Sequence, residues 1–447
     1  MTQEINETEI LQSIRKQKEI FWINPNLKET ELANEQTRYS MATVQDVEDR
    51  LQRFASYFRL VFPETEKNDG LLESEIIKLN GMTNWLEEQY DQELPGNLYL
   101  KRDDLLPISG TIKSRGAIYE VLKYAETLAL DAGVLESTEM DYEIFASEDF
   151  RLFFSDYNIT VGTTGNLGIS VGAMGRALGF EVTVHMSADA RQWKKDYLRE
   201  RRVEVVEHST NFSKAVEIAR YESNNNPNSY FVDDEHSEEL FLGYTVGGYR
   251  MKQQLADEGI QVDEDHPLFV YLPCGIGGSP SGITFGLKQA FGDNVHCFFA
   301  EPTKMPSLLI GLRTQLFDKI AVDDIGLGSL TVADGLAVPR TSALVAKIMD
   351  HYFSGSYTLT DETFQGVLTN LYDQEEIFLE PAAVAGLPGP FKLLRSADGR
   401  NYVKDHQLED KLENATHIAW GTGGSMVPEA EKLEFIAKGK DESITTK

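Results

Sequence analysis

The sequence predicts an α/β protein with two open, mostly parallel, twisted sheets that are flanked by helices. Between residues 158 and 232, short apolar runs typical of strands alternate with amphipathic runs typical of helices. A second set of apolar runs follows at residues 268–272, 295–300 and 417–420. Strand–helix–strand repeats form parallel sheets, and ligands bind at the carboxyl ends of their strands. We therefore expect two lobes with a ligand in the cleft between them.

The two sets of strands also predict the domain organisation. We expect a large domain made of residues 1–113 and 240–447, with helices at residues 44–57 and 74–89 in its first 90 or so residues. A smaller α/β domain would contain residues 114–239. The length of 447 residues agrees with more than one hydrophobic core.

The composition excludes several function classes. The chain carries 42 basic and 72 acidic residues, a net charge of −30. Nucleic acid and anionic lipid require clustered Lys and Arg, so we expect no nucleic acid and no membrane as a partner. The N terminus lacks a secretory signal, and no run approaches the roughly 20 apolar residues of a membrane span. Cys274 and Cys297 lie in apolar segments and are expected to be buried free thiols. We expect a cytoplasmic protein.

A glycine-rich loop at residues 275–279 directly follows an apolar strand and precedes a helical run. Glycines let the backbone approach an anion, and successive N–H groups at a helix N terminus can bind phosphate oxygens. A dinucleotide fingerprint would need a third glycine where Pro280 stands, and the lysine of a nucleotide P-loop is absent. The loop indicates phosphate binding, with a ligand-free tight turn as the alternative.

Two further loops place hydroxyl and glycine residues after predicted strands. Residues 163–166, Thr-Thr-Gly-Asn, precede a helix, where hydroxyl and N–H groups suit a carboxylate; a helix cap by Thr or Asn is the alternative. Residues 421–425 contain Thr422, whose hydroxyl suits a heterocyclic ring nitrogen or merely a turn. Gly168, Gly172, Gly175 and Gly179 are expected to permit close packing of the helix against the sheet rather than to contact a ligand.

Lys113 lies in the segment Ser-Gly-Thr-Ile-Lys-Ser-Arg-Gly, residues 109–116, between a turn and the start of a helix. A lysine that attacks a carbonyl must be deprotonated part of the time, and burial favours that state. Lysine is more often a surface residue. The segment alone therefore leaves a nucleophile and a solvated side chain as alternatives.

Four segments, taken in order, resemble one enzyme family. They are the lysine segment, Thr-Thr-Gly-Asn-Leu-Gly at 163–168, Pro-Cys-Gly-Ile-Gly-Gly-Ser-Pro-Ser-Gly at 273–282, and Gly-Thr-Gly-Gly at 421–424. This order is similar to that of the β-family, or fold type II, pyridoxal-phosphate enzymes. Within that family the chain resembles the bacterial D-serine dehydratases, from about residue 98 to 428. The resemblance implies the cofactor pyridoxal 5′-phosphate in the cleft between the lobes.

The resemblance implies a role for each matching position. Lys113 would form a Schiff base with the cofactor, Asn166 would bind its ring hydroxyl, and Thr422 would face its ring nitrogen. Backbone N–H groups of four residues would bind its phosphate: Gly275, Ile276, Gly277 and Gly278. Three residues would bind the substrate carboxylate: Thr163, Thr164 and Gly165. Glu301 resembles a ligand for a monovalent cation, K⁺ or Na⁺, in related dehydratases.

The implied activity is an ammonia-lyase reaction that converts D-serine to pyruvate and ammonia, with Lys113 as the base at the α-carbon. Asp233 and Asp234 are candidates for recognising the substrate hydroxyl, or they belong to a turn at the end of a strand. Alternatives are an L-serine, L-threonine or D-threonine dehydratase, and a non-catalytic pyridoxal-phosphate-binding regulatory protein. The subgroup resemblance favours a monomer with a small amino acid as its partner.

Overall fold

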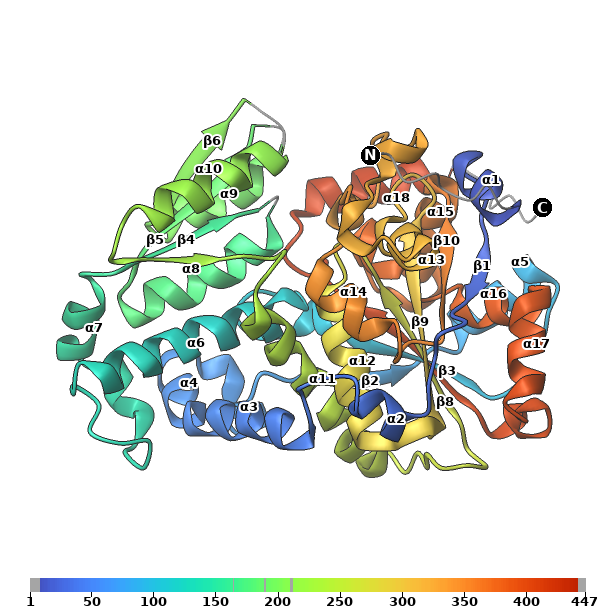
Figure 1. Ribbon diagram of the computed structural model, residues 1–447, viewed down its shortest axis with the longest axis horizontal. Helices are drawn as coiled ribbons and strands as arrows, with labels where there is room; N and C mark the ends of the chain where they lie inside the picture. Colours follow the sequence, from blue (N-terminus) through green and yellow to red (C-terminus); the bar gives the residue numbers. More distant parts are fainter. Residues whose placement is uncertain (1–8, 164, 189, 210–211, 441–447) are drawn as a thin grey trace. The chain divides into compact units, whose positions relative to one another are not determined.

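The computed structural model describes residues 9–440 except 164, 189, 210 and 211. It consists of two compact units, each built around one sheet (Figure 1). The first unit contains Met1–Ser40, Ser74–Asp104 and Gly247–Lys447. The second unit contains Met41–Glu73 and Leu105–Val246. The predicted fold class, α/β with two mostly parallel sheets, is confirmed.

The sheet of the first unit has seven strands in the order β1-β10-β9-β8-β11-β3-β2. Five of them are parallel: β3 (Asn97–Arg102), β8 (Leu268–Pro273), β9 (Val295–Pro302), β10 (Gly355–Leu359) and β11 (Thr416–Gly421). The edge strands β1 (Phe21–Ile23) and β2 (Ile76–Lys78) pair antiparallel. Every residue of β8, β9 and β11 is buried, as expected for parallel strands covered on both faces.

The predicted helix at residues 74–89 is wrong in its first part. Ile76, Ile77 and Lys78 form β2, and the helix α5 (Gly81–Tyr90) begins only at Gly81. Ile77 pairs with Leu100 of β3. Two consecutive β-branched isoleucines suit a strand, but three residues are too few for periodicity to distinguish a strand from the start of a helix.

The strand order of the first unit reverses beside β8. From β8 the chain passes to β9 and then to β10 on one side, whereas β11 lies on the other side of β8. The loops that follow β8 and β11 therefore flank a switch point, where open α/β sheets bind ligands. The remaining helices of this unit are α1 (Glu9–Arg15), α2 (Thr30–Asn34), α12 (Gly278–Phe291), α13 (Ser307–Thr314), α14 (Ala343–Met349), α15 (Asp361–Glu375), α16 (Gly389–Arg395), α17 (Ala397–Asp405) and α18 (Glu429–Lys440).

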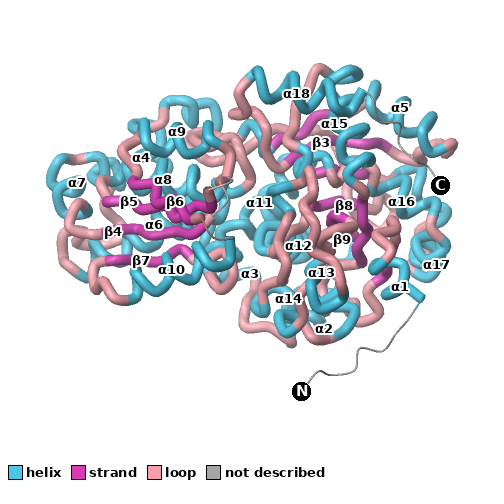
Figure 2. The backbone as a smooth tube through the Cα atoms, turned by 90° about the horizontal axis from the view of Figure 1, so that it is seen from above, coloured by secondary structure: helices cyan, strands magenta, loops and turns pink. Residues whose placement is uncertain are grey.

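The sheet of the second unit has four parallel strands in the order β6-β5-β4-β7. They are β4 (Asn158–Gly162), β5 (Glu181–Ser187), β6 (Glu204–His208) and β7 (Ser229–Val232). Helices α8 (Asn166–Leu178) and α9 (Gln192–Glu200) cover one face, and α10 (Phe212–Asn224) covers the other (Figure 2). The order reverses between β4 and β7, so the loops after these two strands flank the switch point of this sheet.

The helices α3 (Met41–Arg53) and α4 (Ala55–Val61) belong to the second unit, whereas the sequence analysis assigned residues 1–113 to the larger domain. Arg50 and Arg53 of α3 bind the buried Glu126 of α6 (Lys113–Asp131) at 2.6 and 2.8 Å. The unit also contains α7 (Glu148–Phe154) and the first part of α11 (Glu238–Asp257). Helical periodicity shows that a helix has an apolar face but not which neighbour covers it.

Glycines of α8 bring this helix close to its neighbours, as the sequence predicts. A Cβ at Gly172 would lie 2.9 Å from Leu198 of α9, and a Cβ at Gly175 would lie 2.7 Å from Val182 of β5. Side chains at these positions would push the helix away from α9 and the sheet. The close packing fixes the N terminus of α8 over the end of β4.

Both expectations about the cysteines are confirmed, since Cys274 and Cys297 are buried and free. Among the helices of the described residues, none combines the length and the apolar character that a membrane crossing requires.

Candidate active site

Lys113 is the first residue of α6, and its turn is held by a chain of hydroxyl groups. Ser109 Oγ hydrogen-bonds to Ser114 Oγ and, at 2.8 Å, to Ser170 Oγ of α8. Ser170 Oγ also donates to the carbonyl oxygen of Asn166 at 3.1 Å. These hydrogen bonds link the turn before Lys113 to the N terminus of α8. The loop predicted to bind the substrate carboxylate, residues 163–166 (the carboxylate loop), leads into this helix.

The Lys113 ammonium group forms an ion pair with Asp234, which lies just after β7. Nζ is 2.9 and 3.1 Å from the two carboxylate oxygens, and both side chains are 21% exposed. Burial lowers the pKa of Lys113, but Asp234 and Tyr244 outweigh burial and raise this pKa above its ordinary value. Burial favours the neutral amine, as expected, but in this state the ion pair with Asp234 has the larger effect. The amine must lose a proton before it reacts with a carbonyl.

Tyr244 of α11 lies beside Lys113, a neighbour that the sequence analysis missed. A Cβ at Gly116 would lie 2.7 Å from the Tyr244 ring and 2.8 Å from the carbonyl oxygen of Leu240. Glycine at 116 thus allows α11 to approach α6. Burial raises the pKa of Tyr244 more than the Lys113 charge lowers it, so the hydroxyl stays protonated. The sequence feature that could have indicated this neighbour is Gly116, about one helical turn after Lys113, because a glycine lets another helix approach.

The loop between β4 and α8 leads into the N terminus of α8. The N-cap residue of α8 is Gly165, and no side chain of the described residues caps the helix; Thr164 lies outside them. Thr163 is buried, and its Oγ1 accepts a hydrogen bond from the N–H of Gly165 at 3.0 Å. Thr163 therefore does not cap the helix, and a cap by Thr164 lies outside the described residues. A helix N terminus without such a cap attracts anions.

The two aspartates after β7 have different partners. Asp233 accepts two hydrogen bonds from Arg220, at 2.8 and 3.0 Å, and one from the N–H of Glu235 at 3.1 Å. Asp234 faces Lys113 instead. The turn interpretation thus fits Asp233. Of the two aspartates, Asp234 is the one that can interact with a ligand bound next to Lys113.

The glycine loop after β8 turns its carbonyl groups into the protein. The carbonyl oxygen of Gly275 accepts a hydrogen bond from Ser307 Oγ at 3.3 Å. The carbonyl oxygen of Ile276 accepts from Thr341 Oγ1 at 3.0 Å and from the N–H of Ser342 at 3.2 Å. The N–H groups of this loop donate no hydrogen bond to any residue that the structure describes. They are available to an anion.

Two further features fit this loop to a phosphate group. Gly277 has a φ of +105°, and a Cβ there would lie 3.1 Å from Val345 Cγ2. Ser281 in the first turn of α12 is fully buried, and its Oγ has no hydrogen-bond partner among the described residues. Backbone N–H groups at a helix N terminus, beside an unsatisfied hydroxyl, are the donors that a phosphate requires.

Thr422 lies in the loop after β11, across the switch point from the glycine loop. The carbonyl oxygen of Gly423 accepts a hydrogen bond from the N–H of Glu380 at 3.0 Å. Gly424 has a φ of +144°, and a Cβ there would lie 2.7 Å from the Glu380 nitrogen. These backbone contacts hold the loop, and the half-buried Thr422 supplies a neutral hydroxyl.

Glu301, near the end of β9, is fully buried and accepts hydrogen bonds from neutral groups. Oε1 accepts from the N–H of Leu308 at 2.9 Å, and Oε2 accepts from the N–H of Leu309 at 3.0 Å and from Ser356 Oγ at 2.9 Å. Burial raises the pKa of Glu301 to about 8, although these hydrogen bonds lower it. At neutral pH the carboxyl group is therefore protonated unless a cation lies beside it.

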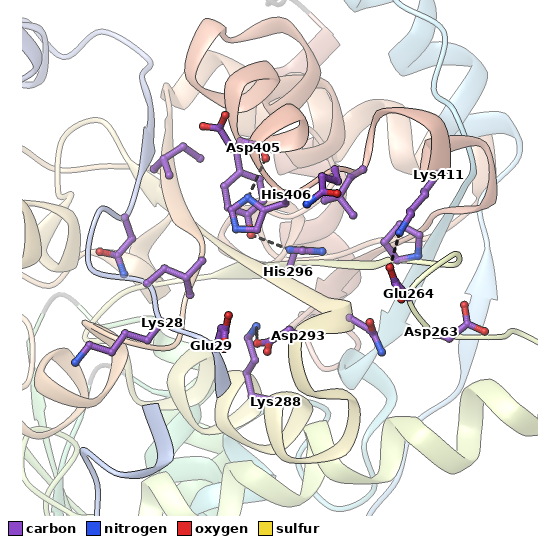
Figure 3. A pocket seen from close by; sticks show the side chains of 18 residues that line it. Lys28, Glu29, Asp263, Glu264, Lys288, Asp293, His296, Asp405, His406 and Lys411 are labelled. Atoms are coloured by element: carbon purple, nitrogen blue, oxygen red, sulfur yellow. Dashed lines mark hydrogen bonds and ion pairs between the residues drawn. The ribbon is translucent and has the colours of Figure 1, made fainter. Parts of the chain in front are cut away.

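A cavity of about 550 Å³ lies at the amino-terminal end of β9 in the first unit (Figure 3). Its lining includes Lys288, Asp293 and Asn294. His296, from the start of β9, shares a hydrogen bond of 2.8 Å with the hydroxyl of Tyr402. The lining contains none of the predicted site residues. This cavity is therefore separate from the candidate active site.

Comparison with known proteins identifies the family. The family of pyridoxal-phosphate dependent enzymes matches residues 76–403. A probable D-serine dehydratase of Bacillus mycoides (strain KBAB4) is 52% identical over 421 residues, which cover 94% of this chain and 94% of that protein. A probable D-serine dehydratase of Halalkalibacterium halodurans is 52% identical over 421 residues, which cover 94% of this chain and 95% of that protein.

Solved structures agree on the fold. Diaminopropionate ammonia lyase from Escherichia coli in complex with D-serine has a TM-score of 0.68 at 16% identity, over 95% of this chain and 98% of that chain. Threonine deaminase isoform 2 from Solanum lycopersicum has a TM-score of 0.59 at 17% identity, over 94% of this chain and 96% of that chain. Together with the family match, these findings establish that the chain belongs to the fold type II family of pyridoxal-phosphate dependent enzymes.

Proposed function

We propose that this enzyme converts D-serine to pyruvate and ammonia. The observation that carries the proposal is the Lys113 amine, paired with Asp234 and tied through Ser109 and Ser170 to the carboxylate loop of the same unit. A lysine so placed can bind a cofactor aldehyde and then act on the α-carbon of an amino acid whose carboxylate the loop holds. The names of the 52% identical relatives and the D-serine in the E. coli structure support this substrate.

The described residues fit the cofactor of this family. N–H groups of residues 275–278 would hold its phosphate, Asn166 would bind its ring hydroxyl, Thr422 would face its ring nitrogen, and Lys113 would bind its aldehyde. When bound, the cofactor withdraws electrons from the α-carbon and makes the α-proton acidic. The neutral hydroxyl of Thr422 does not hold a proton on the ring nitrogen, which favours elimination over racemisation.

The side chains of the second unit perform the proton transfers. Lys113, once deprotonated and free of the cofactor, removes the α-proton of the substrate. Asp234 holds the Lys113 amine in place, and Thr163 and Gly165 shape the loop that binds the carboxylate. The β-hydroxyl takes up one proton and leaves as water, which balances the α-proton that Lys113 removes. Hydrolysis of the released product takes up one water and releases ammonia, so D-serine yields pyruvate and ammonia.

The proposal is tested by assaying the holoenzyme with D-serine, L-serine and D-threonine side by side. Pyruvate is followed with lactate dehydrogenase and NADH for the serines, and the keto acid from D-threonine is followed with a hydrazine reagent. We expect kcat/KM for D-serine to exceed that for L-serine at least about 100-fold. A preference for L-serine would overturn the assignment of the substrate. Bound cofactor without any keto acid would favour a non-catalytic binding protein.

Asp234 is expected to control when Lys113 reacts with the cofactor. Its carboxylate raises the pKa of Lys113, so Asp234→Asn should lower this pKa and increase the neutral amine at a given pH. We expect the pH midpoint for attachment of pyridoxal phosphate to the apoenzyme to fall by about 1 unit or more. The attachment rate is measured by absorbance between pH 6 and 10. Asp233→Asn is the matched control, because Asp233 binds Arg220; equal midpoints in both variants would contradict the role of Asp234.

We also propose that a monovalent cation, K⁺ or Na⁺, lies beside Glu301. The support is a buried carboxylate whose hydrogen-bond donors are neutral. Replacing K⁺ with choline at constant ionic strength is expected to lower activity several-fold in the wild type. Glu301→Gln, which has the shape of a protonated carboxyl group, should make activity independent of the cation. Equal cation dependence in both proteins would contradict this site.

The same substitution gives a pH prediction. Without a cation, the pKa of Glu301 in the folded state, about 8, is above the unfolded value of roughly 4.3. The unfolded state therefore releases this proton first, and the free energy of unfolding falls by up to about 1.4 kcal/mol per pH unit between roughly pH 5 and pH 8. Thermal unfolding in choline chloride should show a smaller loss of stability over this range in Glu301→Gln than in the wild type.

A further inference from the structure

Lys194 lies directly against Gly165 of the carboxylate loop. Helices α8 and α9 are neighbours on one face of the second sheet (Figure 2). A Cβ at Gly165 would lie 2.3 Å from Lys194 Cδ and 3.0 Å from Lys194 Nζ. Gly165 has a φ of +156°, which favours glycine, and the Lys194 side chain lies against its backbone with the ammonium group at the N terminus of α8.

Among the described residues, the buried Lys194 has no counter-ion. The residue is 6% exposed, and its ammonium group lies over the ring of Trp193, whose centroid is 5.5 Å from Nζ. The adjacent Lys195 is also buried, but its Nζ lies 2.7 Å from both Glu207 Oε2 and the carbonyl oxygen of Ala188. Burying an ammonium group without an anion is costly. Lys194 therefore lacks the partner that its neighbour has.

The surroundings of Lys194 are suited to a carboxylate. The first hydrogen bond of α8 runs from the N–H of Ile169 to the carbonyl oxygen of Gly165, and Gly165 contributes no side-chain cap. The N terminus of a helix carries partial positive charge and N–H donors. The Lys194 ammonium group beside it adds a full positive charge. An anion bound between the Lys194 ammonium group and the N terminus of α8 would interact with both.

We infer that Lys194 binds the α-carboxylate of the substrate together with the N terminus of α8, and that it is the residue that makes a free carboxylate a requirement for binding. The inference rests on the proposed function, in which an amino acid occupies this loop. Lys194 makes its contact equally in the bound substrate and in the transition state. It therefore determines KM rather than kcat.

The test compares ligands with and without the carboxylate. D-alanine lacks the leaving group, and D-alaninamide also lacks the negative charge. Binding of both to the holoenzyme is measured by titration calorimetry for the wild type and Lys194→Met. We expect the variant to bind D-alanine about 10- to 100-fold more weakly and D-alaninamide within about twofold of the wild type. The KM for D-serine should rise by the same factor as the dissociation constant of D-alanine, with kcat changed less than about threefold.

Two controls separate this role from a structural one. Lys194→Arg keeps the charge and should retain D-alanine binding within about fivefold. Lys214→Met removes an exposed lysine of α10, paired with Glu217, and should alter neither ligand. Lys194→Met should also melt no lower than the wild type, because it removes a buried unpaired charge.

Equal binding of D-alanine by the wild type and Lys194→Met would overturn the inference, and so would an equal loss for D-alanine and D-alaninamide. A wild-type holoenzyme that binds neither ligand would instead overturn the proposed function. The two failures are therefore distinguishable.

Discussion

Replacing Lys113 with alanine is expected to lower pyruvate formation from D-serine by at least about 10⁴-fold. The variant lacks both the amine that binds the cofactor aldehyde and the base at the α-carbon. The fold should persist, because Lys113 is at the start of α6 and the partner it leaves, Asp234, is 21% exposed and can be hydrated. The coupled assay measures the rate, and circular dichroism checks the fold.

The control for this prediction lies on the same helix. Lys123→Ala removes a lysine that pairs with Glu239 at 2.5 Å, and it should keep activity within about twofold. Methylamine added to Lys113→Ala should restore part of the rate, because a small amine can act as the missing base. Near-normal pyruvate formation by Lys113→Ala without methylamine would refute the role of Lys113 and the mechanism with it.

The strands that carry the site could be predicted because buried parallel strands have a strong pattern. β8 is a continuous apolar run, β9 and β11 are mostly apolar, and the loops after β8 and β11 contain glycines. The strand order could not be predicted, since hydrophobic periodicity does not determine which strands pair. That order is what places the glycine loop and Thr422 on either side of one switch point.

The electrostatic part of the site could not be predicted for a different reason. The protonation state of Lys113 depends on Asp234, which is 121 positions away in the chain. Burial alone favours a neutral amine, whereas the ion pair with Asp234 reverses the sign of the pKa shift of Lys113. The sequence around Lys194 did not mark it as a binding residue either. Lys194 differs from Lys195 in having no anionic partner among the described residues, and only the structure shows this difference.

Gly277→Ala is expected to weaken binding of pyridoxal phosphate about 10- to 100-fold. An L-amino acid at the φ of +105° costs roughly 1–2 kcal/mol or more, and the new Cβ would lie 3.1 Å from Val345 Cγ2 and 3.5 Å from Leu308 Cδ1. The loop can relieve this strain only by rotating its peptide groups. That rotation turns the N–H donors away from the phosphate. Cofactor affinity is measured by equilibrium dialysis of the apoenzyme.

Gly259→Ala is the matched control for backbone strain in the same unit. Gly259 has a φ of +70° but no atom within 4 Å of its imaginary Cβ, so the variant should lose stability without losing cofactor affinity. Pyridoxal, which lacks the phosphate, should bind equally to the wild type and Gly277→Ala. If Gly277→Ala weakened pyridoxal as much as pyridoxal phosphate, the loop would support the ring rather than the phosphate. That result would refute the assignment of the phosphate to the N–H groups after β8.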